Sequence, residues 1–280
     1  MAFIQLPAWN LRARREYREV LILADGYQLH GYLSFGEESE SNWIIFVHGN
    51  RKAGQDHPLY MQMRNNFPRQ YPVLALDLRG FGRSADTRLK EAPEILDRSP
   101  DLLAATRYLH EHYDVIQKNI ILIGHSLGAA QVFHLAQNYE YQLVIPIGLG
   151  DWDGVLEDRT KMSGYIARFM NNTGVRMTME QLQKEGSNFT SQALLSSCPH
   201  SPVWIIFAER DEARLPLYPD YLRLREACGD RLHWTTIPLA DHVYGTELTW
   251  LPHPLRRIYS NLVVSILKWR LGVILDHYEP

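Results

Sequence analysis

The stretch IILIGHSLG, residues 120–128, joins a short apolar run to a serine that is flanked by glycines. Its last five residues match the pattern G-x-S-x-G, which is typical of a sharp turn from a strand into a helix. Small residues suit such a turn because bulky side chains would collide across it. Residues 127–137 follow with apolar positions at helical spacing. The sequence therefore predicts that Ser126 stands clear of a sheet, with its hydroxyl at a helix N-terminus.

Other short apolar runs recur along the chain, at residues 43–47, 73–76, 143–149, 203–207 and, less clearly, 234–237. Continuous apolar runs of this length are typical of strands that are buried on both faces of a parallel sheet. Segments with helical spacing lie between or after them, at residues 99–109, 218–227 and 254–271. This alternation predicts an α/β fold with a parallel sheet covered by helices.

Two stretches depart from this alternation. Residues 19–24 and 27–35 are rich in β-formers and flank Asp25-Gly26, which predicts a hairpin at a sheet edge. Residues 151–201 offer helical pieces and no strand, and Thr178 with Gln181 predicts a capping box. We therefore expect residues 1–150 and 202–280 to form the core and residues 151–201 to form a helical insertion. This insertion either packs over the sheet edge or also acts as a lid.

Composition narrows the function classes. The chain has 280 residues and 29 basic against 32 acidic side chains, so no net positive field favours nucleic acid. No run approaches the roughly 18 apolar residues of a membrane span. The first residues are apolar and then basic, the reverse of a secretory signal, which predicts a cytoplasmic protein without stable membrane insertion. Cys198 and Cys228 match no zinc or redox spacing and are expected to be reduced thiols.

A serine hydroxyl is a poor nucleophile near neutral pH, so Ser126 needs a base and an acid that orients the base. His242 is the predicted base because it follows the last candidate strand, where a loop would bring it over the carboxyl edge of the sheet. Asp211 is the predicted acid because it follows the run 203–207. His125 is expected to point away from the pocket. Four other carboxylates remain open as the acid: Glu209, Glu212, Asp151 and Asp153.

An oxyanion that forms at the substrate carbonyl needs two preorganised donors. The backbone N–H of Leu127, next to the serine, is one predicted donor. Asn50 is predicted to contribute the other from the loop after residues 43–47, where Gly49 lets the backbone come close to the substrate. His48 in the same loop is expected to brace it without a catalytic role.

Three blocks together resemble the α/β-hydrolase superfamily: FVHGN at 46–50, LDLRGFGRS at 76–84 and GHSLG at 124–128, with Asp211 and His242 after them. The order serine, acid, histidine is the order of that superfamily. Within it, the chain is most similar to the branch of serine aminopeptidases and monoacylglycerol lipases. The resemblance implies an eight-stranded, mostly parallel sheet, a Ser-His-Asp triad and no metal or organic cofactor. The basic pair Arg51-Lys52 is unusual beside a pocket for neutral lipid, and is either solvent-exposed or meets a substrate carboxylate or phosphate.

The sequence thus predicts a serine hydrolase that cleaves a carboxylic ester or thioester of a small or acyl-chain substrate. An aminopeptidase or amidase, or an acyltransferase, is an alternative on the same triad. The aminopeptidase would need carboxylates in the insertion to hold a substrate's amino terminus, and the candidates are Asp153, Glu157, Asp158 and Glu180. A ligand-binding module with an idle triad is the alternative from another class.

Overall fold

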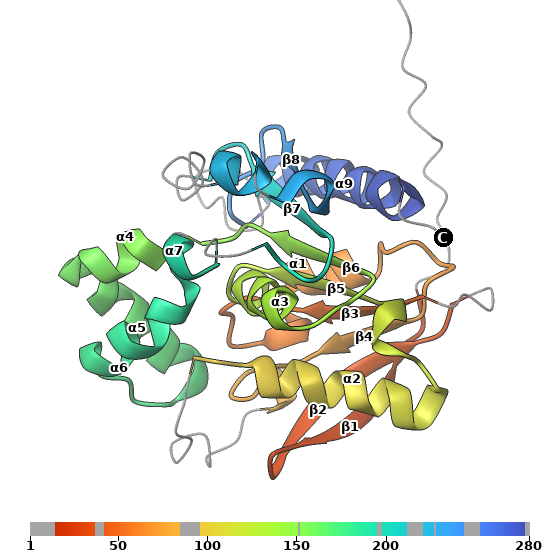
Figure 1. The fold of residues 1–280 in the computed structure, drawn as a ribbon, viewed down its shortest axis with the longest axis horizontal. Helices are drawn as coiled ribbons and strands as arrows, with labels where there is room; N and C mark the ends of the chain where they lie inside the picture. Colours follow the sequence, from red (N-terminus) through yellow and green to blue (C-terminus); the bar gives the residue numbers. More distant parts are fainter. Residues whose placement is uncertain are drawn as a thin grey trace, which may run out of the picture.

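An eight-stranded sheet runs through the molecule in the order β1-β2-β4-β3-β5-β6-β7-β8 (Figure 1). The computed structural model describes residues 15–36, 42–84, 96–150, 152–194, 198–211, 221–226, 228–243 and 253–277. The strands are β1 (Arg18–Ala24), β2 (Tyr27–Ser34), β3 (Trp43–Val47), β4 (Val73–Leu76), β5 (Ile120–His125), β6 (Leu143–Ile147), β7 (Val203–Ala208) and β8 (Leu232–Ile237).

The strands from β4 to β8 in the sheet order pair in parallel, and β2 pairs antiparallel with both β1 and β4. β1 and β2 join through Asp25-Gly26 and form one edge, which confirms the predicted hairpin. The expected eight-stranded, mostly parallel sheet is also confirmed. Because five neighbouring pairs are parallel, the carboxyl ends of their strands meet at one edge of the sheet, where ligands bind in such folds.

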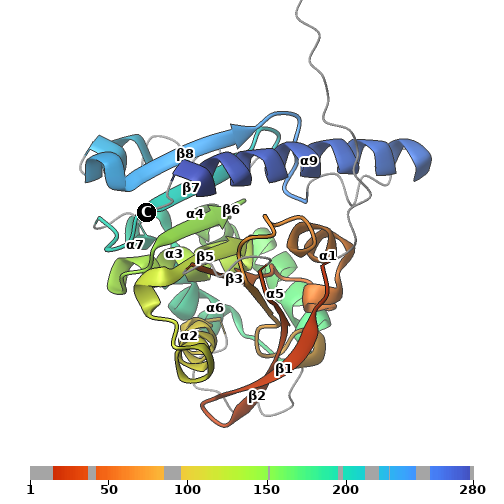
Figure 2. The same ribbon diagram turned by 90° about the vertical axis from the view of Figure 1, so that its right-hand side faces the viewer.

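Helices cover both faces of the sheet (Figure 2). Alternate residues of β3 show the division, because Ile45 and Val47 pack in one buried cluster and Ile44 and Phe46 in the other. The first cluster takes in α2 (Ser99–Tyr113) and α3 (Leu127–Asn138). The second takes in α1 (Pro58–Arg64) and α9 (His253–His277). The run of apolar residues in each central strand therefore reflects burial on both faces.

In the described residues between β6 and β7 lie four helices: α4 (Trp152–Glu157), α5 (Arg159–Thr173), α6 (Met179–Gly186) and α7 (Ser191–Leu194). They gather beside one end of the sheet, in green in Figure 1. Thr178 caps α6, and its side chain and that of Gln181 each accept the other residue's backbone N–H, as the sequence predicts. Described residues 152–194 contain no strand. A lid function for this helical insertion, and its expected limits at residues 151 and 201, stay predictions.

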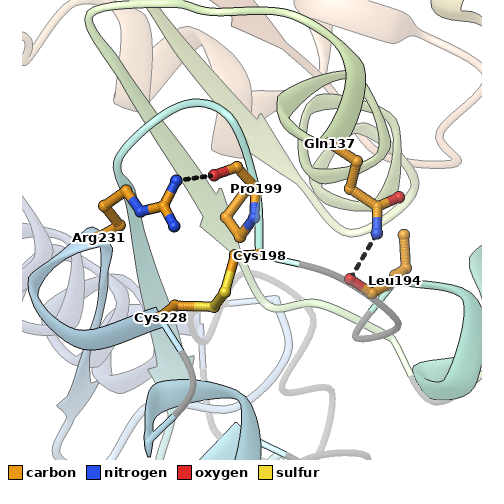
Figure 3. The surroundings of a disulfide bond; sticks show 6 residues. All are labelled: Gln137, Leu194, Cys198, Pro199, Cys228 and Arg231. Carbon is orange, nitrogen blue, oxygen red and sulfur yellow. Dashed lines mark hydrogen bonds between the residues drawn. A yellow bond between two sulfur atoms is a disulfide. The ribbon is translucent and has the colours of Figure 1, made fainter.

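Cys198 and Cys228 form a disulfide, so the prediction of two reduced thiols is wrong (Figure 3). Cys198 precedes β7 and Cys228 precedes β8, and these two strands are parallel neighbours in the sheet. Their amino-terminal approaches therefore lie side by side and place the Cα atoms 5.4 Å apart, within the normal range for a disulfide. The two cysteines are 30 residues apart in sequence, which gave no local signal of this contact.

The C-terminal helix α9 extends from His253 to His277, longer at both ends than the predicted 254–271. The predicted helix at 218–227 begins outside the described residues, and residues 221–226 are helical. Within the described part of the chain, no helix has the combined length and apolarity needed to cross a bilayer.

Candidate active site

β5 ends at His125, and α3 begins at Leu127, so Ser126 alone makes the turn between them. Its φ of 54° and ψ of −112° are rare for a residue with a side chain, and such conformations cluster at functional sites. The neighbouring glycines are needed for space. A Cβ on Gly124 would lie 2.2 Å from the Gly128 carbonyl oxygen, and a Cβ on Gly128 would lie 2.6 Å from the His48 carbonyl oxygen. The predicted strand-to-helix turn is therefore present, with the serine at the helix N-terminus.

Two loops at the carboxyl edge of the sheet bring His242 and Asp211 to Ser126. The Ser126 hydroxyl oxygen lies 2.9 Å from Nε2 of His242, and Nδ1 of His242 lies 2.7 Å from Oδ2 of Asp211. Because a carboxylate only accepts hydrogen bonds, Nδ1 donates to Asp211, and Nε2 is left to accept the serine proton. Asp211 is 9% exposed, so its charge is held out of water against the imidazole.

The alternative acids stand elsewhere or cannot be placed. Glu209 is exposed, and its carboxylate accepts the backbone N–H of Leu239. Asp153 lies on α4 and does not line the cavity in front of the serine. Glu212 and Asp151 lie outside the described residues. Of the described candidates, Asp211 is the carboxylate that contacts His242.

The two predicted oxyanion donors also border the cavity next to Ser126. Leu127 is the first residue of α3, where backbone N–H groups have no acceptor within the helix. The positive end of the helix dipole adds to this preference for negative charge. Asn50 lies on the loop that follows β3 and also lines the cavity. The geometry thus brings together all five predicted site residues, whose catalytic roles stay predictions.

The helical insertion holds Asn50. The Nδ2 group of Asn172, on α5, donates to the Asn50 side-chain oxygen at 2.8 Å and to its carbonyl oxygen at 3.0 Å. The Nδ2 group of Asn50 itself is buried and has no hydrogen-bond partner in the described part of the chain. Sequence reasoning missed Asn172 because the contact spans 122 residues.

A buried hydrogen-bond chain joins the Asn50 loop to the His242 loop. Nε2 of His125 lies 2.8 Å from the carbonyl oxygen of His242 and must donate to it. Nδ1 of His125 therefore accepts from the Tyr60 hydroxyl at 3.0 Å, and Tyr60 accepts the Gly49 N–H at 2.9 Å. Burial lowers the pKa of His125 well below 6.5, which keeps the ring neutral. His125 thus hydrogen-bonds to the backbone of His242 and is among the residues that line the cavity, so the expectation that it points away from the pocket is wrong.

His48 and Asp77 stabilise the loop after β3 that carries Asn50. Nε2 of His48 accepts the Leu78 N–H at 3.1 Å, so Nδ1 donates to the Gly49 carbonyl at 2.6 Å. Burial lowers the pKa of His48 to about 4. The buried carboxylate of Asp77 accepts the N–H groups of Gln55 and Arg83, and desolvation raises its pKa to about 6. Both residues hold loops in place, as the sequence predicts for His48.

The cavity in front of Ser126 has a volume of about 690 Å³. Apolar and aromatic side chains form much of its wall: Leu127, Trp152, Val155, Tyr165 and Val243. Three cations also line it, namely Arg51, Lys161 and Arg168. Of the basic pair noted in the sequence, Arg51 reaches this cavity, whereas Lys52 is exposed and does not line it.

The sequence profile of the alpha/beta hydrolase family matches residues 44–265, and the chain belongs to that family. A search of curated protein sequences finds no match. Among solved structures, the fold is similar to an esterase of Pyrococcus furiosus, Pf2001, at 18% identity and a TM-score of 0.59, over 91% of this chain and 92% of the esterase. The narrower resemblance to the aminopeptidase and monoacylglycerol lipase branch stays a prediction.

Two further structures share the fold. Est1E from Butyrivibrio proteoclasticus, solved with ferulic acid bound, is 17% identical with a TM-score of 0.54, over 89% of this chain and 99% of Est1E. The acylaminoacyl peptidase of Pyrococcus horikoshii is 14% identical with a TM-score of 0.60, over 90% of this chain and 41% of the peptidase. At these identities the likeness concerns the fold, and family membership supports a hydrolase.

Proposed function

We propose that the protein is a serine hydrolase that cleaves a carboxylic ester or thioester through an acyl-enzyme. The observation that carries this proposal is the hydrogen-bonded series from Ser126 through His242 to Asp211 at the wall of a cavity. His242 takes the serine proton as the hydroxyl oxygen attacks the substrate carbonyl, and Asp211 stabilises the imidazolium that forms. The N–H groups of Leu127 and Asn50 stabilise the oxyanion.

The second half of the reaction uses the same groups. Collapse of the tetrahedral intermediate breaks the bond to the leaving group, which receives its proton from His242. Water then enters, gives a proton to His242 and attacks the acyl-enzyme carbonyl. The acid product leaves, and the proton returns to Ser126. An ester is favoured over an amide because its leaving alcohol demands less protonation.

The cavity argues against an aminopeptidase. That activity needs a carboxylate near the substrate's amino terminus, and the candidates Asp153, Glu157, Asp158 and Glu180 do not line the described cavity. Two cations of α5, Lys161 and Arg168, stand there instead and would repel an α-ammonium group. We therefore place the ester or thioester hydrolase ahead of the peptidase.

A fluorophosphonate probe tests the nucleophile. We expect mass spectrometry to find the label on Ser126, and we expect Ser126→Ala to lose both labelling and hydrolysis of p-nitrophenyl esters. Ser163→Ala is a matched control, because Ser163 is exposed on α5 and its hydroxyl donates to the Arg159 carbonyl. Absence of label on the folded protein would contradict the proposal and favour the ligand-binding module with an idle triad.

The small-molecule acyl substrate and the cytoplasmic location stay predictions. The disulfide between Cys198 and Cys228 weighs against that location, because disulfides persist in oxidising compartments and are rare in the cytosol.

A further inference from the structure

The charge of the cavity wall is one-sided. Its described lining holds three cations, Arg51, Lys161 and Arg168, and a single carboxylate, Asp211. Asp211 is hydrogen-bonded to His242 and is therefore committed to that imidazole. A hydrolase for a wholly neutral ester has no need of such a lining, whereas an anionic substrate would be attracted by it.

The two cations of α5 lie on one face of that helix. Lys161, Gly164, Tyr165 and Arg168 stand at positions i, i+3, i+4 and i+7 of the helix, and all four line the cavity. Gly164 has no side chain, and a Cβ there would have no other atom within 4 Å. The surface of α5 is therefore open at this position between Lys161 and Arg168. Lys161 and Arg168 are two turns apart, about 10 Å along the axis, and their long side chains can converge on one ligand.

Arg51 adds positive charge from the loop that follows β3. It follows Asn50, and its charge contributes, after burial and His242, to the lowered pKa of His125. The hydrogen bonds from Asn172 to Asn50 tie the C-terminal end of α5 to this same loop. The two sources of positive charge are therefore held to a common wall. Asp158, which caps the start of α5, does not line the cavity.

We infer that the ester carries a second, anionic group, a carboxylate or a phosphate, which Lys161 and Arg168 of α5 bind together with Arg51. This inference rests on the proposed function and narrows its substrate class. The apolar wall of Trp152, Val155 and Val243 receives the uncharged part of the substrate. Guanidinium groups match the geometry of carboxylate and phosphate oxygens, so both anions fit this wall.

Matched esters separate charge from size. p-Nitrophenyl valerate and the mono-p-nitrophenyl ester of glutaric acid have acyl chains of equal length, and only the second carries a carboxylate. We expect kcat/KM to be roughly tenfold higher for the glutarate ester at low salt, since each exposed ion pair contributes up to about fivefold. The preference should shrink at high salt because screening weakens exposed pairs. The p-nitrophenyl ester of 4-phosphonobutyric acid, compared with the glutarate ester, shows which anion is preferred.

Neutral variants assign the preference to residues. Lys161→Gln and Arg168→Gln should each lower kcat/KM for the anionic esters more than for valerate, so that the ratio falls toward one. Arg159→Gln is the control, because Arg159 is an exposed cation of the same helix that does not line the cavity. It should leave the ratio as it is. A ratio near one in the unsubstituted protein overturns the inference, as does a preference that survives both substitutions.

A binding measurement keeps this inference separate from the proposed chemistry. Ser126→Ala can be titrated calorimetrically with glutarate and with valeramide, which is uncharged, and binding needs no turnover. Tighter binding of glutarate that weakens in the double variant with Arg168→Gln supports an anion site, even if no ester is hydrolysed and the proposed function fails. Hydrolysis of both esters at equal rates, with no binding of glutarate, leaves the serine hydrolase standing and overturns the anion site.

Discussion

Tyr60 and His125 link the two loops that carry the candidate donor Asn50 and the candidate base His242. Each hydrogen bond in the chain has one possible direction, because it ends at an amide N–H of Gly49 and at a carbonyl of His242. A buried chain of this kind is costly to interrupt, since each group that loses its partner stays out of water. These two residues therefore position the site, and the hydrogen bonds of their side chains in this series go to Gly49, to each other and to His242, not to the Ser126 hydroxyl.

Tyr60→Phe removes the hydroxyl at the middle of this chain. We expect the free energy of unfolding to fall by about 1–3 kcal/mol, because the Gly49 N–H and Nδ1 of His125 are both left unpaired. We also expect kcat for ester hydrolysis to fall while KM changes less, because the Asn50 loop loses its support. Denaturant unfolding and steady-state kinetics measure the two effects.

Tyr141→Phe is the matched control for that substitution. Tyr141 is equally buried, and its hydroxyl lies 3.3 Å from that of Thr106, but it does not line the cavity. It should lower stability slightly and leave kcat unchanged. If Tyr60→Phe also leaves kcat unchanged, the hydrogen-bond chain supports only the fold.

The buried histidines make stability depend on pH. Burial lowers the pKa of His48 to about 4 and that of His125 well below 6.5, so the unfolded chain binds more protons as pH falls below 6.5. Their contribution is full above pH 6.5 and is lost toward pH 4, by about 2 kcal/mol for His48 at pH 5. Asp77 acts in the opposite sense, because its raised pKa of about 6 favours the folded state as pH falls from 6 to 4.

We expect the histidines to prevail, because two groups act against one. The free energy of unfolding should be lower at pH 5 than at pH 7 by about 1 kcal/mol or more. Urea denaturation followed by tryptophan fluorescence at the two pH values measures the difference. Equal or greater stability at pH 5 would mean that these rings are not held neutral in the folded protein.

At the scale of elements, the turn between β5 and α3 depends on how closely α3 approaches the loop after β3. Gly128, in the first turn of α3, lies against the backbone of Val47 and His48. On α9, by contrast, a Cβ added to Gly272 would have no other atom within 4 Å. One substitution can therefore have opposite effects in two helices of the same protein.

Gly128→Ala should destabilise the protein by several kcal/mol or move α3 away from β3, because backbone atoms cannot yield as a flexible side chain does. Gly272→Ala should stabilise it by up to about 1 kcal/mol, because alanine is the better helix former. Denaturant midpoints of both variants, together with fluorophosphonate labelling of the first, test this contrast. A stable and fully labelled Gly128→Ala protein would contradict the close approach.

For the molecule as a whole, the disulfide ties the approaches of β7 and β8 together and encloses Asp211 in its loop. A closed loop of 30 residues restricts the unfolded chain and stabilises the fold by about 3–4 kcal/mol in the chain-entropy account. We expect dithiothreitol to lower the Tm of the protein. The double variant Cys198→Ser with Cys228→Ser should have a low Tm that dithiothreitol does not change. Thiol titration of the denatured, unreduced protein should find no free thiol from this pair.

Much of this protein could be read from local sequence. The runs 43–47 and 73–76 coincide with β3 and β4, and the edge hairpin lies where Asp25-Gly26 predicts it. Burial on both faces and tight turns restrict which residue types can stand next to one another in the sequence. Both features can therefore be recognised from one amino-acid sequence. Ser126, Asp211 and His242, whose catalytic roles stay predictions, were chosen in the same way, because each follows a strand at the carboxyl edge of the sheet.

Contacts between segments that are distant in sequence could not be predicted from local sequence patterns. Asn172 on Asn50, His125 on the backbone of His242, and Cys198 bonded to Cys228 join segments that only the strand order and the packing of the helical insertion bring together. The sequence by itself determined most strands and the strand-to-helix turn at Ser126, because steric and hydrophobic constraints there act between near neighbours. The tertiary structure alone decided the disulfide and the cations of the cavity wall, because these depend on where separate elements meet in space.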